Sequence, residues 1–253
     1  MTVAELPTLA RPPRRVVSLV PSLTEAVAVT AADLLVGATD YCACPAGLDV
    51  ARVGGTKYPD VAAVLAVTPD LVLANVEENR PQDVAALRAA GVPVWVTYPR
   101  GVPAALDTLA TMFALLDRPA PAWLAEAGRS WAGPPPPVVA TVVVPVWRRP
   151  WVVLGGGTFA GDVLRRLGYA NRHADASEPY PRPTLPALVA GADLVVLPDE
   201  PYAFTAADGP EAFPGQPCAL VSGRHLTWYG PSLVTAPEVL RAQLAATVTA
   251  SRP

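Results

Sequence analysis

Short apolar runs recur along the chain, and segments with helical spacing separate them. The runs are rich in valine and leucine and lie at residues 16–20, 33–38, 70–74, 92–97, 138–144, 151–154, 193–197 and 218–221. Their length and continuous apolar character are typical of strands that are buried on both faces of a sheet. Helices are expected between them, for example at residues 83–91 and 158–168. Strands that alternate with helices predict an α/β protein with mainly parallel sheets.

Polar residues mark where some of these helices begin. Ser22 and Glu25 have the spacing of a capping box, in which both side chains bind free backbone amides at the first turn. Asp60 stands directly before an apolar helical segment and is expected to cap it through its carboxylate.

The pattern changes between residues 102 and 137. Two amphipathic helices are expected there, and prolines at positions 134–137 end the second one. We therefore predict an N-terminal α/β lobe at residues 1–101, a helical connection with a proline-rich linker at 102–137, and a C-terminal α/β lobe at 138–253. Each lobe is expected to be Rossmann-like.

Two stretches, one in each expected lobe, share an unusual order. YPDVAAVLAVTPDLVLANVEE (58–78) and YPRPTLPALVAGADLVVLPDE (180–200) both run from Tyr-Pro through a helix and a buried strand into adjacent acids. This order indicates an internal duplication, although any two βα units have some similarity. The acids Glu77 and Glu78 either start a helix, whose positive end they favour, or contact a ligand or partner.

Ligands of open parallel sheets meet the loops at the carboxyl ends of the strands. The residues that follow the predicted strands therefore predict the site, and in the second half they are rich in aromatic side chains. Such walls, with a few polar groups at the rim, suit a large and partly apolar ligand. This position brings Ser22, Glu78 and Trp151 into the candidate set.

Composition excludes several classes of function. With 51% hydrophobic and 16% charged residues, the chain of 253 residues is expected to be compact, and its net charge of -3 gives no footprint for nucleic acid or an anionic membrane. Three cysteines suggest free thiols in a reducing compartment. The first ten residues do not look like a secretory signal, and no apolar stretch reaches the ~18 residues of a membrane span, so a cytoplasmic location is expected.

Catalytic and metal motifs are weak. The chain has no GxSxG or HExxH, and GGGTFAG lacks the ending of a phosphate-binding loop, so an enzyme is the less favoured alternative. The glycines at 155–157 are expected to form a tight turn that admits a ligand or the facing lobe. The two histidines, His173 and His225, predict no metal site.

Several segments together resemble a known family. The order and spacing of VVSLVPSLTE, VGATDYCACP, RVGGTKYPD, PDLVLANVEEN, VWVTYPR, LPDEPYAFT and LTWYGP are similar to those of the vitamin-B12-binding and iron-siderophore-binding proteins of ABC importers. These are the helical-backbone (class III, TroA-like) substrate-binding proteins, and the likeness spans about residues 14–250, with the cobalamin-binding branch nearest. It implies two α/β lobes, a helical connection, and one ligand cleft between the lobes without chemistry.

The resemblance also implies contacts to a corrinoid, with aromatic faces against the macrocycle and with Arg100 and Glu200 on its polar side arms. In this context His225 is either a surface histidine or a ligand of the corrinoid cobalt. Together with the three residues chosen by position, the candidate ligand-binding residues are Ser22, Tyr41, Gly55, Thr56, Lys57, Asn75, Glu78, Arg100, Trp147, Trp151, Glu200, Tyr202, Phe204, Trp228 and Tyr229.

The expected function is therefore non-catalytic binding of cobalamin or a related corrinoid by a monomer, as an intracellular carrier. The alternative is a leaderless copy of an importer component for cobalamin, haem or a ferric siderophore, docking on an ABC permease. Family members that dock present an acid on each lobe. Asp60 fits that place on the first lobe, whereas the second holds Pro186, with only Glu178 or Glu200 nearby.

Overall fold

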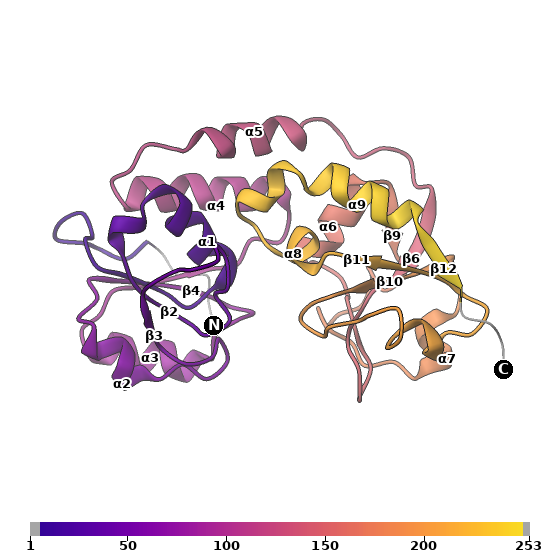
Figure 1. The fold of residues 1–253 in the computed structure, drawn as a ribbon, viewed down its shortest axis with the longest axis horizontal. Helices are drawn as coiled ribbons and strands as arrows, with labels where there is room; N and C mark the ends of the chain where they lie inside the picture. The colour runs from indigo at the N-terminus through magenta and orange to yellow at the C-terminus, as the bar shows by residue number, and fades with distance from the viewer. Residues whose placement is uncertain (1–5, 250–253) are drawn as a thin grey trace. The chain divides into compact units, whose positions relative to one another are not determined.

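The computed structural model describes residues 6–249 and divides into two compact units, which are considered separately here (Figure 1). Unit 1 comprises the residues up to Pro99, Leu106–Ala125 and Tyr229–Pro231. Unit 2 comprises Arg100–Ala105, Glu126–Trp228 and the residues from Ser232 on. The units interleave along the chain, where the sequence predicts three consecutive segments. Three residues from the C-terminal part therefore belong to the first unit.

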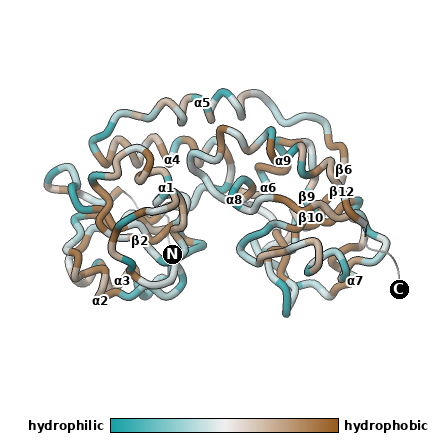
Figure 2. The backbone as a smooth tube through the Cα atoms, viewed as in Figure 1, coloured by the Kyte–Doolittle hydropathy of each residue, from teal (hydrophilic) through white to brown (hydrophobic). Residues whose placement is uncertain are grey.

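Unit 1 is built on a five-stranded parallel sheet. In pairing order its strands are β3 (Ala51–Arg52), β2 (Leu35–Ala38), β1 (Val16–Ser18), β4 (Leu71–Asn75) and β5 (Val94–Thr97). Its helices are α1 (Pro21–Thr30), η1 (Ala32–Leu34), α2 (Val61–Ala66) and α3 (Pro81–Ala89). All five residues of β4 are buried, as expected for a central parallel strand, and the strands are hydrophobic in Figure 2.

The core of unit 1 follows from strand periodicity. Alternate residues of β4 and β5 point to the same face, where Val72, Ala74 and Val96 pack with Val64 of α2 and Leu87 of α3. Burial of each such valine or leucine side chain contributes about 1.5–3 kcal/mol. This apolar cluster holds the sheet rigid beneath the loops at its carboxyl ends.

The two predicted helix caps have opposite outcomes. Asp60 caps α2 as predicted, because its Oδ1 accepts a hydrogen bond of 3.0 Å from the backbone amide of Ala63. The capping box at Ser22 is wrong: α1 begins at Pro21 and Val20 is its N-cap, without a side-chain cap. With proline at the first helical position the helix starts two residues earlier than predicted, so Ser22 and Glu25 lie inside the helix and are buried.

Unit 2 contains a second five-stranded sheet. In pairing order its strands are β12 (Thr247–Thr249), β11 (Pro217–Val221), β10 (Leu194–Pro198), β6 (Ala140–Val143) and β9 (Tyr169–Asn171), of which only the β12–β11 pair is antiparallel. The run at 151–154 does not join this sheet. It contains β8 (Val152–Val153), which forms an antiparallel hairpin with β7 (Pro145–Trp147). The helices are α6 (Phe159–Arg166), α7 (Leu185–Val189), η2 (Pro210–Ala212), α8 (Gly223–Thr227) and α9 (Ala236–Ala245).

Residues 102–137 are helical, as predicted. They form α4 (Val102–Leu115) and α5 (Ala122–Ser130), and each helix is divided between the two units. A further turn, η3 (Pro231–Val234), begins at the last residue of the segment Tyr229–Pro231 that belongs to unit 1. Within residues 6–249, no helix is both long enough and apolar enough to span a membrane.

The two sheets repeat one plan. The order β2-β1-β4-β5 of unit 1 matches the order β9-β6-β10-β11 of unit 2, so β4 and β10 occupy equivalent places. The aspartate directly before each of these two strands makes the same kind of hydrogen bonds. Asp70 exchanges hydrogen bonds of 2.9 Å with the backbone of Arg15, and Asp193 exchanges bonds of 2.7 and 2.8 Å with the backbone of Thr141. Shared topology and shared contacts support the internal duplication.

Candidate ligand-binding site

The candidate residues of unit 1 come together because parallel strands end at the same edge of a sheet. Tyr41 follows β2, residues 54–57 follow β3, and Asn75 ends β4, with Glu77 and Glu78 directly after it. The sequence prediction therefore selects one edge of this sheet. The structure shows which of these side chains are available there.

A buried polar network organises this edge. The Nδ2 of Asn75 donates hydrogen bonds of 2.7 Å to the hydroxyl of Tyr229 and 3.3 Å to Oγ1 of Thr97. Its backbone amide donates to Oδ1 of Asn79, whose own Nδ2 donates to the carbonyl of Thr56 at 2.9 Å. Because these groups are buried and paired, they position the loop and are not exposed for a ligand.

Glu78 lies beside this network in a desolvated environment. Burial raises the pKa of its carboxyl group, Lys57 and a hydrogen bond with the Thr56 side chain oppose that rise, and Glu77 adds to it. The ammonium group of Lys57 donates to the backbone carbonyl of Glu77. Glu77 and Glu78 follow β4 and precede α3, which begins only at Pro81, so they lie in the loop and outside that helix.

Two tyrosines of unit 1 are exposed near this edge. The side chains of Tyr41 and Tyr58 are 68% and 71% exposed. A methyl group on Gly55 would lie 3.5 Å from Cε2 of Tyr41, so the ring covers that glycine. The guanidinium carbon of Arg80 stands 4.3 Å from the centre of the Tyr58 ring. Tyr58 is absent from the sequence-based set, although it ends the GGTKY segment that directed attention to this loop.

In unit 2 the candidate aromatics form a cluster around the β7–β8 hairpin. Trp147 contacts Tyr202 edge-on at 5.7 Å between ring centres, and Trp151 stacks parallel to Phe204 at 6.3 Å. Tyr202 and Phe204 are 4.6 Å apart. Of these, Phe204 is 3% exposed and belongs to the core, whereas Trp147 is 46% exposed at the end of β7. Trp147 is therefore the ring of this cluster that is most available to a ligand.

The hairpin also carries two arginines whose surroundings are acidic. Arg148 forms ion pairs with Asp208 and Glu211, and its guanidinium carbon lies 5.4 Å from the centre of the Trp151 ring. The hydroxyl of Tyr202 donates a hydrogen bond of 2.6 Å to Asp208, and the carboxyl pKa of Asp208 is lowered by this bond and by the two arginines. The formal charges of Arg148 and Arg149 are thus offset by two neighbouring carboxylates.

Other candidate residues have a structural place. Ser22 and Tyr229 are buried in unit 1, and a methyl group on Gly230 would lie 3.1 Å from the carbonyl of Ser22. Trp228 is partly buried beside Arg224, at 6.0 Å from its guanidinium carbon. Nδ1 of His225 is 2.8 Å from Oγ of Ser222, and Nε2 is 3.4 Å from Oγ1 of Thr235. These contacts hold the imidazole in place.

Two glycines of the triplet at 155–157 leave room for another backbone segment of the same chain. A methyl group on Gly155 or Gly156 would lie 2.2 Å from the carbonyl oxygen of Glu178 or Ala174, respectively. The segment 174–179 therefore passes directly over these two glycines, in place of the ligand or facing lobe expected from the sequence. Gly157 has a φ of 63° and lies near Arg100, whose Nη1 would be 3.6 Å from a methyl group there. Glu200 similarly covers Gly223, since a methyl group on that glycine would lie 2.3 Å from its Cγ.

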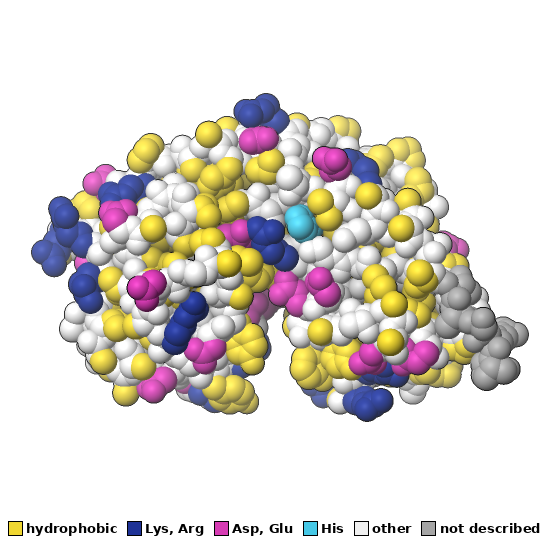
Figure 3. Space-filling model, in the orientation of Figure 1, with side chains coloured by type: hydrophobic (Ala, Val, Ile, Leu, Met, Phe, Trp, Pro, Cys, Tyr) yellow, Lys and Arg dark blue, Asp and Glu magenta, His cyan; other side chains and the backbone are white. Residues whose placement is uncertain are grey.

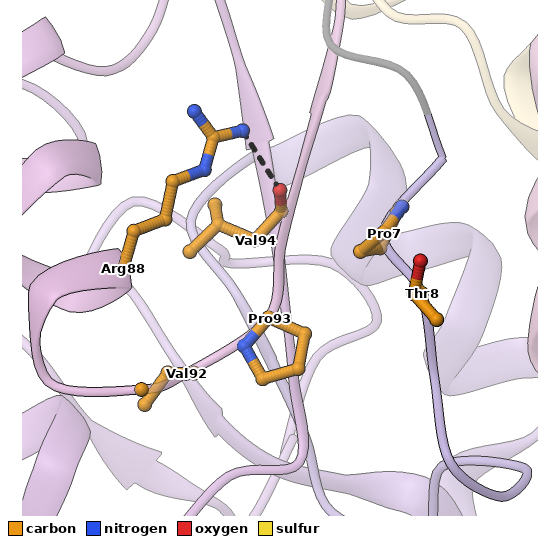
Figure 4. Close-up of a pocket in the computed structure, with 7 residues that line it drawn as sticks. Pro7, Thr8, Arg88, Val92, Pro93 and Val94 are labelled. Carbon is orange, nitrogen blue, oxygen red and sulfur yellow. Dashed lines mark hydrogen bonds between the residues drawn. The ribbon is translucent and has the colours of Figure 1, made fainter.

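A surface depression in unit 1 lies at the opposite edge of its sheet. Its lining comes from Pro7, Thr8, Arg88 and residues 91–94, which precede or begin β5 (Figure 4). Arg88 donates a hydrogen bond of 3.0 Å to the carbonyl of Val94 there. The depression thus lies at the amino end of a parallel strand and has no part in the candidate site.

The distribution of surface charge and of metal-binding side chains indicates which kind of molecule the candidate site could bind. On the face seen in Figure 3, positive and negative side chains are interspersed and no continuous basic patch appears. Within the described residues, no three His, Cys, Asp or Glu side chains are grouped as metal ligands. Aromatic faces and a few polar groups are the chemistry available at the two carboxyl edges.

Comparison with known proteins places this architecture in a class. No protein-family model matches the chain. The structure of the periplasmic heme-binding protein from Roseiflexus sp. RS-1 in apo form aligns with a TM-score of 0.71 and 19% identity, over 91% of this chain and 99% of that one. Nickel(II)-bound CeuE of Helicobacter pylori aligns with a TM-score of 0.77 and 14% identity, over 94% and 85%. The chain has the fold of the helical-backbone (TroA-like) substrate-binding proteins.

Within that class, the resemblance to vitamin B12-binding proteins is confirmed. The vitamin B12-binding protein of Vibrio cholerae serotype O1 is 23% identical over 200 residues, which are 75% of this chain and 71% of the relative. The crystal structure of the periplasmic vitamin B12-binding protein of Vibrio cholerae has a TM-score of 0.72 and 19% identity, over 92% of this chain and 97% of that one. These relatives are binding proteins, which agrees with a function in ligand binding.

Proposed function

We propose that this protein binds a cobalamin-like corrinoid without chemical conversion, using the carboxyl-end loops of both sheets. The observation that carries the proposal is the exposure of large rings at those loops, with Tyr41 68% and Trp147 46% exposed. Aromatic side chains that are left in solvent at a strand's carboxyl end suit the flat face of a macrocycle. The name of the Vibrio cholerae relative gives the same ligand class.

Some of the remaining candidates contact the ligand in this proposal, and the others support the residues that do. Lys57, Glu78, Arg100 and Glu200 offer polar atoms for side arms of the ligand, and Thr56 and Gly55 shape the loop below Tyr41. Tyr202 and Trp151 support Trp147 within the unit 2 cluster. Asn75, Phe204 and Tyr229 are too buried for direct contact and fix the positions of their neighbours.

The test is a titration of tryptophan fluorescence with cyanocobalamin, repeated with haem and with one ferric siderophore. Saturable quenching by the corrinoid at one equivalent per chain, after inner-filter correction, is the expected result. Trp147→Phe tests whether the hairpin ring reports binding, and Trp123→Phe is the matched control, since Trp123 packs on Phe113 at 5.9 Å. Saturation by haem or the siderophore but not the corrinoid contradicts the proposal.

Two cellular roles are compatible with this proposal: the protein acts as a carrier inside the cell, or it is the binding component of an ABC importer. Asp60, an exposed helix cap, is the candidate permease contact on unit 1. Fractionation of cells that express the native gene distinguishes the two: a carrier is expected in the cytoplasm and an importer component outside it.

A further inference from the structure

We infer that Glu78 determines specificity by favouring a ligand with amide side arms over one with carboxylate side arms, an inference that rests on the proposed function. The two ligand classes differ in this respect. Corrinoids of the cobalamin type carry primary amides around the ring, whereas haem carries two propionates. A carboxylate accepts hydrogen bonds from an amide N–H but repels another carboxylate.

The loop that presents Glu78 is fixed by its own polar groups. The amide of Asn75 donates to Oδ1 of Asn79 at 2.9 Å, and the amide of Glu77 donates to Oδ1 of Asn75 at 2.6 Å. Asn79 is tied in turn to the carbonyls of Leu19 and Thr56. These bonds hold the turn in one conformation, so the two acids after β4 have defined positions at the carboxyl edge.

The Glu78 carboxylate retains acceptor capacity in this position. Among residues 6–249, no lysine, arginine or histidine nitrogen forms an ion pair with it; the ammonium of Lys57 instead donates to the backbone carbonyl of Glu77. The side chain of Thr56 supplies one hydrogen bond. An ionised carboxylate accepts about four, so ligand N–H groups can still be received. Since the side chain is partly buried, its repulsion of another anion is less screened than at an exposed position.

The exposed ring of Tyr41 is carried by a neighbouring segment and supports a ligand surface close to this group. Tyr41 is 68% exposed and covers Gly55, the residue directly before Thr56. The loop that hydrogen-bonds Glu78 is therefore the loop that carries the exposed ring. A macrocycle seated on Tyr41 would bring its peripheral arms to Glu78.

The experiment compares two corrins with the same ring. Dicyanocobinamide carries amide arms, and dicyanocobyrinic acid carries carboxylates at the same positions. Dissociation constants are measured by fluorescence at pH 7.5 for the wild type, Glu78→Gln and the control Glu126→Gln, whose side chain is exposed on α5. The wild type and the control are expected to prefer the amide form by roughly tenfold or more. In Glu78→Gln the ratio is expected to fall toward one, because glutamine removes the charge.

The pH dependence gives a second readout that does not require a variant to fold. The charged groups around Glu78 are Lys57 and Glu77, and Tyr229 also lies near, since Glu78 contributes to the raised pKa of its hydroxyl. Because the pKa of Glu78 is raised, this group is protonated before an ordinary carboxyl as the pH falls, and its repulsion of a carboxylate decreases. The preference for the amide corrin is therefore expected to shrink as the pH is lowered in the wild type, beyond any change seen in Glu78→Gln.

The outcomes distinguish a failure of the proposed function from a failure of the inference about Glu78. Binding of neither corrin by the wild type overturns the proposed function and this inference with it. Equal binding of both corrins by a wild type that does bind overturns this inference alone, as does a preference that Glu78→Gln leaves unchanged. A preference that falls in Glu78→Gln and persists in Glu126→Gln establishes Glu78 as the residue that selects amide arms.

Discussion

Tyr229 joins the C-terminal part of the chain to the polar network of unit 1. Its side chain is 6% exposed, and its hydroxyl lies 2.7 Å from Nδ2 of Asn75 and 3.1 Å from Oγ1 of Thr97. Removal of the hydroxyl leaves a buried amide and a buried hydroxyl short of a partner. Such groups cost free energy because water cannot reach them.

We therefore expect Tyr229→Phe to lower the free energy of unfolding by about 1–2 kcal/mol. Urea denaturation at neutral pH, followed by circular dichroism, measures the change. Tyr58→Phe is the matched control, since that ring is 71% exposed, and its effect is expected to stay within about 0.5 kcal/mol. Equal effects of the two substitutions would show that the network at Asn75 contributes nothing to stability.

At the residue scale, the sequence predicts where a residue lies in a helix or strand better than it predicts how exposed its side chain is. It correctly placed Asp60 at a helix start, because a cap depends on neighbours three residues away. It grouped Tyr229 with the ligand walls, yet the partners that bury this ring lie at positions 75 and 97, more than a hundred residues away. No local pattern records such a contact. For the same reason the exposed Tyr58 was left out of the candidate set.

At the scale of elements, the turn between β8 and α6 depends on the absence of side chains. The amide of Gly155 donates a hydrogen bond of 2.8 Å to the carbonyl of Pro179, so the two backbones are in direct contact. A methyl group on Gly155 would lie 2.2 Å from the carbonyl oxygen of Glu178, far inside van der Waals contact. The neighbouring atoms are backbone and proline, which cannot rotate away.

Gly155→Ala is accordingly expected to destabilise the protein by at least about 2 kcal/mol, since the 174–181 segment must move. Gly128→Ala is the control, because Gly128 lies within α5 and no atom comes within 4 Å of the added methyl. That change is expected to raise stability by about 0.5–1 kcal/mol through a better helix former. Thermal denaturation of both variants measures the difference, and a neutral Gly155→Ala would refute the packing argument.

The long apolar strands were predicted, whereas most of the shortest strands were not. β4 and β10 each have five buried residues, so their sequences show the continuous apolar runs of central parallel strands. By contrast β3, β7, β9 and β12 have two or three residues, too few to establish a period. Their pairing depends on neighbours that are distant in sequence. The run at 151–154 looked like a strand of the main sheet and instead pairs with β7 as a hairpin.

At the scale of the whole molecule, one plan occurs twice. In both sheets the first strand lies beside the strand that occupies the equivalent place, β1 beside β4 and β6 beside β10, and each sheet presents loops at its carboxyl edge. Unit 1 exposes Tyr41 at that edge, and unit 2 exposes Trp147 on the hairpin that follows β6. Two similar edges are compatible either with two separate ligands or with one ligand that contacts both.

The two arrangements give different results for paired substitutions. If one ligand contacts both units, Tyr41→Ala and Trp147→Ala each weaken cyanocobalamin binding by roughly tenfold, because each removes one aromatic face. The double variant loses roughly a hundredfold, since the sites have no shared partner and their free energies add. Isothermal titration calorimetry measures affinity and stoichiometry together, with Val139→Ala, an exposed residue outside both edges, as the control. Two equivalents of ligand per chain would indicate a separate ligand on each unit, whereas an affinity that responds to only one of the two rings would assign the ligand to that unit and leave the other edge without a part in binding.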